Sequence, residues 1–295
     1  MISNLEEKST HDVSESLFAI FNNSVNEIRN LAGQVPDNIV ESVHLIRKRL
    51  KFLRAFVKLT QFCSEKENYK PINYILRDCG RTISDCRDAH VRGLILDELS
   101  QDKSICLLIE GLAELNDGLT KKIEHDLFSG INVFNELVGQ ITDEQVIQYF
   151  DSMQPDADCL VAGYALGYHK SYHAFHSGLV SHKADLLHEW RKRTKDLQYQ
   201  QEALIESIPD QLTPSYEQVA SLCEVLGRIN DLFMFLEWLD LIDDSVDNQN
   251  QLSDLKNMLD EELQGLGEQA NTDGKLLFTL SPKEYSQTLS KEMDL

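Results

Sequence analysis

Proline and glycine are scarce in this sequence, which has 6 prolines and 14 glycines among 295 residues. So few turn-forming residues argue against a β-sandwich, a β-barrel or a disordered chain. Long apolar runs are absent as well: the longest candidate, from Asp231 to Ile242, is interrupted by Glu237 and Asp240. A membrane-spanning helix needs roughly 18 or more consecutive apolar residues, so the sequence predicts none.

Basic residues are also few. The chain has 28 Lys and Arg against 49 Asp and Glu, which gives a formal net charge of −21. A general DNA-binding protein would be basic overall, so nucleic acid is not expected as a partner. With 42% apolar and 26% charged residues, the composition is otherwise that of a globular protein with one large or two medium domains.

The N-terminus and the cysteines predict a cytoplasmic protein. Residues 1–16 are polar and acidic, and they lack the basic start and apolar stretch of a secretory signal. The six cysteines, at positions 63, 79, 86, 106, 159 and 223, form no C-x-x-C pair and no zinc-finger spacing. We therefore interpret them as small apolar core residues in a reducing cytoplasm.

Apolar residues recur at helical spacing along nearly the whole chain. The expected helices cover about 17–32, 37–63, a stretch opened by Pro71, 82–99, 102–116, 118–138, 143–150, 156–180, 183–207, 215–227, 228–245 and 251–266, with a short extended piece and a helix in 274–295. No segment shows the alternation of a strand. The predicted fold class is therefore all-α, built from helical bundles.

An internal repeat is the most informative feature of the sequence. The segment VHLIRKRLKFLR (43–54) matches LHEWRKRTKDLQ (187–198) at a constant offset of 144 residues. Further along, the pair Arg87-Asp88 has a counterpart in Asn230-Asp231 at an offset of 143. Two landmarks in the same order at nearly the same offset predict a duplicated helical unit.

Both copies of this repeat predict helices with a basic face. Residues three, four and seven positions apart share one side of a helix, and in each copy these positions hold His, Arg and Lys. No acidic residue interrupts the first stripe between His44 and Lys58. Such like charges cost about 0.2–0.5 kcal/mol per neighbouring pair, which surface helices usually avoid with alternating acids. The stripe therefore indicates a binding site for a polyanion, because Arg and Lys bind phosphate oxygens. The alternative is that the stripe pairs with acidic helices of the same chain.

The repeated motifs resemble those of a known family. Two copies of His-x-x-Arg-Lys-x-x-Lys, each followed by a helix with an (Arg/Asn)-Asp pair, resemble the CHAD domain, the conserved histidine α-helical domain. HEWRKRTKDLQYQQEAL and LCEVLGRINDL are similar to the second half of its pattern, and SDCRDAHV to the first half. The resemblance runs from about residue 10 to 245. It implies two similar four-helix bundles that form one unit with a basic central groove or pore.

The resemblance also implies a function: non-catalytic binding of inorganic polyphosphate, with no cofactor. Three places depart from the family pattern. Gln198 stands where Arg is common, and Glu202 stands where the first copy has Lys58. The helix at 168–176 reads YHKSYHAFH, where Arg is common after the first Tyr.

The expected polyphosphate contacts lie on the two basic helices: His44, Arg47, Lys48, Lys51, Arg54, Lys58, His188, Arg191, Lys192, Lys195 and Tyr199. Secondary phosphate contacts are expected at Lys170, His173, Arg77, Arg81 and Arg87. We expect no catalytic residue and no metal. Asp88 and Asp231 are expected to orient or neutralise basic neighbours. The protein is expected in the cytoplasm, in association with polyphosphate granules.

Three alternatives stay open at this stage. His169, His173 and His176 share one helix face and have the spacing of a transition-metal site. The His-Asp dipeptides at 11–12 and 125–126 are typical of helical metal-dependent phosphohydrolases acting on phosphate esters. A structural adaptor that recruits partners to polyphosphate granules is the third.

The predicted organisation has four parts. They are an N-terminal extension (1–9), a first helical bundle repeat (10–150), a second repeat core (151–245) and an acidic C-terminal helical extension (246–295). From Glu237 to the end, 14 acidic residues face 4 lysines. This extension is either a solvated surface or a segment that competes with ligand for the basic helices.

Overall fold

The computed structural model describes residues 10–35, 37–64, 69–102, 104–141, 144–181, 184–204 and 216–292. These residues form eleven α-helices, two short 3₁₀ helices and no strand, which confirms the all-α class. The α-helices are α1 (Thr10–Gln34), α2 (Ile39–Leu59), α3 (Lys70–Thr82), α4 (Ser84–Leu99), α5 (Cys106–Gln140), α6 (Glu144–Asp151), α7 (Ala157–Ser181), α8 (Ala184–Leu204), α9 (Tyr216–Leu241), α10 (Gln249–Leu277) and α11 (Pro282–Glu292). The 3₁₀ helices are η1 (Thr60–Phe62) and η2 (Asp243–Ser245).

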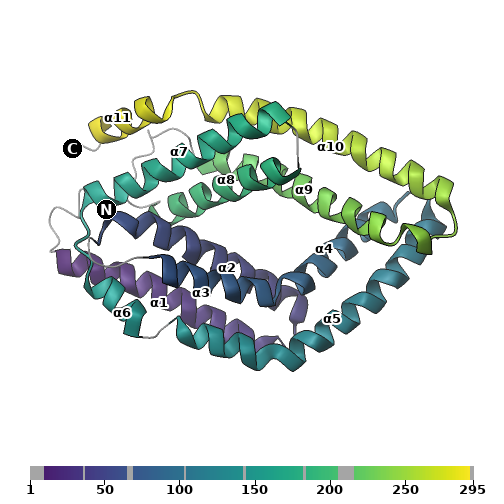
Figure 1. Cartoon of the computed structure of the whole chain (residues 1–295), viewed down its shortest axis with the longest axis horizontal. Helices are drawn as coiled ribbons and strands as arrows, with labels where there is room; N and C mark the ends of the chain where they lie inside the picture. The colour runs from purple at the N-terminus through teal and green to yellow at the C-terminus, as the bar shows by residue number, and fades with distance from the viewer. Residues whose placement is uncertain are drawn as a thin grey trace.

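Helices α2 and α8 lie in the middle of the molecule (Figure 1). They pack against each other, and each also packs against its sequence neighbours, α1 and α3 for α2, and α7 and α9 for α8. Helices α10 and α11 follow each other along one long edge, while α1 and α5 lie along the opposite edge. Because α2 and α8 carry the repeated basic motif, this arrangement brings its two copies together at the centre.

Two clusters of buried side chains hold these helices together. The larger contains residues of α1, α2, α3, α7, α8 and α11, among them Phe21, Leu53 and Trp190. The smaller lies between α4, the first half of α5, the second half of α9 and the first half of α10. Both clusters draw on helices from either side of residue 150, so the core crosses the predicted boundary between the repeats. The division into two similar bundles stays a prediction.

The orientation of the basic face of α2 is determined by the apolar residues on its opposite face. Val43, Ile46, Leu50 and Leu53 recur at helical spacing, and all are at most 2% exposed. Burial of such side chains stabilises the fold by about 1.5–3 kcal/mol each. Helix α8 follows the same plan with buried Leu187, Trp190, Thr194 and Leu197. The buried faces therefore fix the direction in which the basic residues point.

Several expected helix boundaries are wrong. The segments expected as separate helices at 102–116 and 118–138 form the single helix α5, and those at 215–227 and 228–245 form α9. Gly118 and Gly227 lie inside these helices, where the cost of a glycine of about 1 kcal/mol is small against the packing of a long helix. Helix α10 continues to Leu277, well past the predicted end at 266.

The C-terminal helices are part of the folded core. Leu252, Leu255 and Leu259 of α10 belong to the smaller cluster, and Tyr285 and Leu289 of α11 belong to the larger one. Helix α10 packs along α9, and α11 packs along α7. These helices support the fold, so the idea of a C-terminal segment that competes for the basic helices gains no support.

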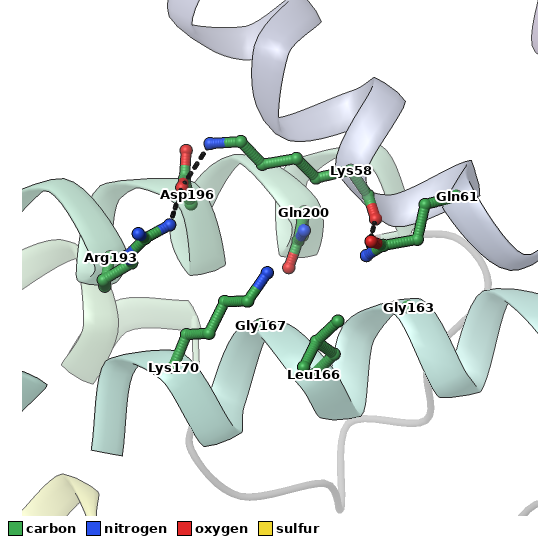
Figure 2. Close-up of a pocket in the computed structure, with 9 residues that line it drawn as sticks. All are labelled: Lys58, Gln61, Gly163, Leu166, Gly167, Lys170, Arg193, Asp196 and Gln200. Carbon is green, nitrogen blue, oxygen red and sulfur yellow. Dashed lines mark hydrogen bonds and ion pairs between the residues drawn. The ribbon is translucent and has the colours of Figure 1, made fainter. Parts of the chain in front are cut away.

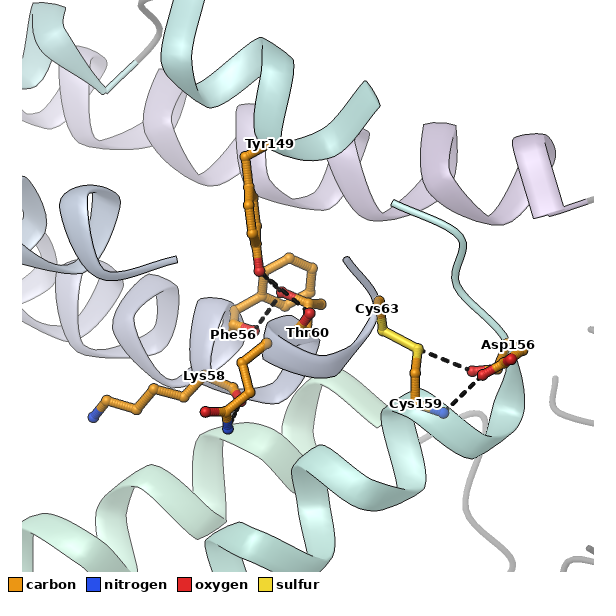
Figure 3. The surroundings of a disulfide bond; sticks show 8 residues. Phe56, Lys58, Thr60, Cys63, Tyr149, Asp156 and Cys159 are labelled. Carbon is orange, nitrogen blue, oxygen red and sulfur yellow. Dashed lines mark hydrogen bonds between the residues drawn. A yellow bond between two sulfur atoms is a disulfide. The ribbon is translucent and has the colours of Figure 1, made fainter. Parts of the chain in front are cut away.

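The interpretation of all six cysteines as reduced thiols is wrong for two of them. Cys63, just after η1, and Cys159, in the first turn of α7, form a disulfide across 96 residues of chain. The other four are free, and Cys79, Cys86 and Cys223 are buried as expected. Figure 3 shows the setting of the bond, where the Asp156 carboxylate accepts a hydrogen bond from the Cys159 backbone N–H at 2.7 Å. The disulfide therefore joins the end of the first basic helix segment to the beginning of α7.

Removal of this disulfide should destabilise the protein only under oxidising conditions. A cross-link over a long loop restricts the unfolded chain, and the loss of one typically costs about 2–4 kcal/mol. Cys63→Ser should therefore lower the free energy of unfolding by this amount in urea titrations without a reductant. In dithiothreitol, the variant and the wild type should unfold at similar urea concentrations. A wild-type midpoint that is insensitive to dithiothreitol would show that the bond does not form in solution.

Close packing of α7 on α2 depends on Gly163. A methyl group added there would overlap the backbone carbonyl oxygen of Leu59, which cannot move aside. Gly163→Ala should thus lower the free energy of unfolding by about 1–3 kcal/mol, the usual cost of overpacking. The matched control is Gly118→Ala in α5, where an added methyl meets nothing within 4 Å. The control should be neutral or stabilising, and urea denaturation that shows equal losses for both variants would contradict the packing described.

Candidate anion-binding site

Basic side chains from three helices converge between α2, α4, α8 and α9. We call this group the cationic cluster; its members are His44, Arg47, Lys48 and Lys51 of α2, Arg87 of α4, and Arg191 and Lys195 of α8. The four helices enclose it because α2 packs on α4 and α8, and α9 packs on both α4 and α8. The cluster therefore combines six of the contacts expected from the basic stripes with Arg87, which was expected as a secondary contact.

Charge repulsion inside the cluster is strong. Burial is the largest cause, and the positive charges of Arg191, Arg47 and Lys195 add to it; together they lower the pKa of Lys51 from its usual 10.5 to about 7. Burial likewise lowers the pKa of His44, with Arg87 as the largest of the neighbouring charges that add to the effect. The protein thus holds cations together at a place that disfavours positive charge.

Carboxylates lie near the cluster, but those of the described residues form no short ion pairs with its members. Asp231 interacts with Lys51 and Arg87, and Asp88 interacts with Arg47. Within the described part of the chain, however, no member of the cluster has a salt-bridge partner within 4.0 Å. The predicted role of Asp88 and Asp231 is therefore one of partial, longer-range neutralisation. Burial raises the pKa of Asp88.

Hydrogen bonds orient several members of the cluster. The Arg47 guanidinium donates to the carbonyl of Gly80 at 3.2 Å. The Lys195 ammonium donates to the side-chain oxygen of Gln198 at 2.7 Å and lies 5.3 Å from the centre of the Tyr199 ring. Gln198, which stands where Arg is common in the CHAD pattern, thus accepts a hydrogen bond that orients Lys195. Tyr199 is 4% exposed and belongs to the larger core cluster, so its ring is held in place beside Lys195.

His188 lies at the edge of the cluster beside a cavity. Its Nδ1 is 2.8 Å from the side-chain oxygen of Asn230, the residue that the repeat aligns with Arg87. A cavity of about 580 Å³ between α8 and α9 is lined in part by His188, Asn230 and Phe233. The second copy of the motif therefore borders a hollow next to the cationic cluster.

The outer part of the basic stripes is neutralised by acids of the same chain. Lys58 forms a 2.6 Å ion pair with Asp196, and Arg193 lies 3.8 Å from the same carboxylate (Figure 2). Lys192 and Arg193 also pair with Glu189, at 3.0 and 2.6 Å. The alternative of internal pairing thus holds for the outer segment of the stripe.

A small cavity of about 10 Å³ at this outer end has room for a single water molecule. Lys58, Lys170 and Gln200 line it, and Figure 2 shows Lys170 extending toward it from α7. Arg54 donates a hydrogen bond to the side-chain oxygen of Asn73 at 3.1 Å. These outer residues are thus held by partners on the neighbouring helices, Lys58 by Asp196 of α8 and Arg54 by Asn73 of α3.

The remaining secondary contacts are distributed over two helices. On α3, Arg77 and Arg81 both pair with Asp78, at 2.9 and 3.5 Å, and both contribute positive charge near Arg54. On α7, His173 is exposed and its Nε2 lies 3.1 Å from Nε2 of His169. The third histidine of the expected metal face, His176, instead packs against the Tyr172 ring.

The phosphohydrolase alternative finds no support in the geometry. His125 and Asp126 are exposed on α5, and the side chains of His11 and Asp12 lie outside the described part of the structure. Among the described residues, the group of three side chains placed closely enough to bind a metal consists of Cys86, His90 and Glu124. It includes neither of the His-Asp dipeptides. Sequence patterns gave no sign of this group, since Glu124 is 34 residues from His90.

Comparison with known proteins identifies the family. The family model of the CHAD domain matches residues 19–240, so the chain belongs to the CHAD domain family. A crystal structure of the CHAD domain from the plant Ricinus communis is similar to this fold, with a TM-score of 0.63 and 18% sequence identity. The match covers 95% of this chain and 91% of that one. No curated protein matches the sequence. No described helix combines the length and apolar character required to cross a membrane.

Replacement of Lys51 tests the electrostatic description of the cluster. Because the pKa of Lys51 is about 7 in the fold and 10.5 ordinarily, the unfolded chain binds more protons between these values. The contribution of Lys51 therefore makes the free energy of unfolding rise with pH from about 7 to about 10. Lys51→Met should remove this rise, and it should stabilise the protein at neutral and lower pH by up to about 4 kcal/mol, since one pKa unit corresponds to about 1.4 kcal/mol.

Urea denaturation at a series of pH values measures both effects. The control is Lys122→Met, which removes an exposed lysine from α5. This control should leave the pH dependence of stability as in the wild type. Parallel pH profiles for the wild type and Lys51→Met would contradict the strained state of Lys51.

Proposed function

We propose that this protein binds inorganic polyphosphate non-covalently at the cationic cluster and performs no catalysis. The observation that carries the proposal is the unpaired state of the cluster: its three arginines and three lysines, from α2, α4 and α8, have no salt-bridge partner among the described residues. A linear polyphosphate offers a negative charge at every unit and would relieve their repulsion. Membership of the CHAD family supports the same function, since polyphosphate binding is what that resemblance implies.

The cluster residues form the inner set of proposed contacts. They are His44, Arg47, Lys48, Lys51, Arg87, Arg191 and Lys195, with His188 at the edge. The other expected contacts, Arg54, Lys58, Lys192, Lys170, His173, Arg77, Arg81 and Tyr199, form an outer set. Many of these are already satisfied by protein partners, as Lys58 is by Asp196. Contacts by the ion-paired members, Lys58, Lys192, Arg77 and Arg81, would require exchange of an internal ion pair for a phosphate.

Proton uptake should accompany binding. A bound phosphate raises the pKa of a neighbouring ammonium group, so Lys51 would regain its proton above pH about 7. Affinity should then fall as pH rises through this range. Lys51 supplies more of this dependence than His44, because the fold lowers the pKa of His44 and leaves that ring less charged at neutral pH.

We also propose a cytoplasmic location in association with polyphosphate granules. The four free cysteines fit a reducing compartment. The Cys63–Cys159 pair is a disulfide that fits an oxidising one, so its redox state bears directly on this part of the proposal. An adaptor role would be an addition to binding, and no specific contact in the structure favours it.

A charge-reversal pair tests the site. Lys48→Glu combined with Arg191→Glu places acids on both basic helices within the cluster. The variant should bind long-chain polyphosphate at least about tenfold more weakly, a loss of about 1.4 kcal/mol or more. Counterion release also predicts a weaker salt dependence, with the slope of log affinity against log salt smaller by about 1–2. Fluorescence anisotropy with labelled polyphosphate at several salt concentrations measures both.

The matched control is Lys122→Glu combined with Lys275→Glu. Both lysines are exposed, on α5 and α10, and the change in net charge is the same. The control should retain nearly the wild-type affinity and salt dependence. If both double variants lose affinity equally, the effect is one of overall charge and the cluster is not the site. Single-stranded RNA of equal charge, added as competitor, should displace polyphosphate poorly.

A further inference from the structure

A second cluster of polar side chains lies between α4 and α5. Cys86 and His90 stand one helical turn apart on α4, and Glu124 faces them from α5. Nε2 of His90 lies 2.8 Å from the Glu124 carboxylate and 3.6 Å from Sγ of Cys86. The three candidate ligand atoms all lie within 4.8 Å of one another.

These distances match the needs of a small tetrahedral ion. Zinc binds Cys sulfur, His nitrogen and carboxylate oxygen at about 2.0–2.3 Å, which places neighbouring ligand atoms about 3.5 Å apart. The Cys86–His90 separation already has this value, and the His90–Glu124 contact would open by less than about 1 Å. Nδ1 of His90 is buried with no partner among the described residues, so the interactions of the ring all pass through Nε2.

The charge of the group also fits a divalent cation. A deprotonated Cys86 and an ionised Glu124 supply two negative charges, and His90 binds as the neutral ring. With Zn²⁺ the group has no net charge, which is what a buried site requires. Cys86 is 2% exposed and His90 is 8% exposed. A thiolate and an imidazole favour zinc over hard ions such as Mg²⁺ or Ca²⁺.

Comparison of the two repeats argues against a purely structural role for these residues. At the offset of 143 that aligns Arg87-Asp88 with Asn230-Asp231, Cys86 corresponds to Ile229 and His90 to Phe233. Ile229 is a buried core residue, and Phe233 packs against the core. The second repeat fills these positions with apolar side chains. Packing alone therefore does not call for the polar pair found in the first repeat.

An open position remains for a further ligand. His90 also lines a cavity of about 390 Å³ between α4 and α5, together with Asn116, Asp97 and Thr120. Zinc sites with three protein ligands keep their fourth position for water or a small ligand. A cavity of this size beside the cluster can hold that water.

From this geometry we propose that Cys86, His90 and Glu124 form a zinc-binding site in the first half of the fold. None of its ligands belongs to the cationic cluster, although Cys86 is the neighbour of Arg87 on α4. Zinc bound there ties α4 to α5, the pair of helices that covers one side of the smaller core cluster.

Metal-binding measurements on the full chain test this proposal. The protein is stripped with a chelator under reducing conditions and titrated with Zn²⁺ against a chromogenic chelator. A single zinc should bind per chain, and Cys86→Ser and Glu124→Gln should each weaken it at least about tenfold, since even changes around metal ligands cost this much. Co²⁺ in place of zinc should give a thiolate-to-metal charge-transfer absorption that is lost in Cys86→Ser.

Two control variants make the result specific. Cys79→Ser changes a free, fully buried cysteine of α3, and His173→Asn removes half of the exposed His169–His173 pair; neither should alter the affinity. Glu124 is partly exposed, so Glu124→Gln should keep the fold, and far-UV circular dichroism checks each variant. Absence of zinc binding overturns the proposal. So does zinc binding that survives Cys86→Ser and Glu124→Gln, or that is lost in His173→Asn.

Discussion

Repulsion among the cations of α2, α4 and α8 is the constraint on which the centre of this structure depends. The apolar faces of α2 and α8 are buried in the same core, and their burial holds the two basic faces next to each other. The cost is visible at Lys51, whose pKa falls to about 7. Such a strained arrangement persists only when the surrounding packing outweighs it. The deeply buried Leu53, Trp190 and Leu197 provide that packing.

The acidic residues in the rest of the chain restrict where on the protein a polyanion can bind. Asp196 and Glu189 neutralise the outer cations Lys58, Lys192 and Arg193, and Glu98 and Glu262 do the same for Arg228. The central cations are left without such partners within the described residues. With a net charge of −21, the remaining surface repels polyanions. A bound polyanion should therefore be confined to the cluster.

The sequence predicted the helices of the site, but it did not predict which distant residues their side chains contact. The repeated His-x-x-Arg-Lys-x-x-Lys motif, with apolar residues on its opposite face, was enough to predict two amphipathic basic helices. It could not show that Lys58 pairs with Asp196, which lies 138 residues away, because such contacts depend on how helices pack. The same holds for the Cys63–Cys159 disulfide and for Glu124 facing His90. The helix breaks expected near residues 117 and 227 were wrong because tertiary packing keeps α5 and α9 helical through Gly118 and Gly227 despite the local cost of glycine.

The most direct test of the account is the chemical reactivity of individual lysines with and without polyphosphate. An amine-acylating reagent modifies exposed lysines, and mass spectrometry gives the rate at each position. The account predicts that long-chain polyphosphate slows modification of Lys48, Lys51 and Lys195, while Lys122 and Lys275 react as before. Unchanged rates at the three cluster lysines in saturating polyphosphate would contradict the central claim that these cations form the binding site.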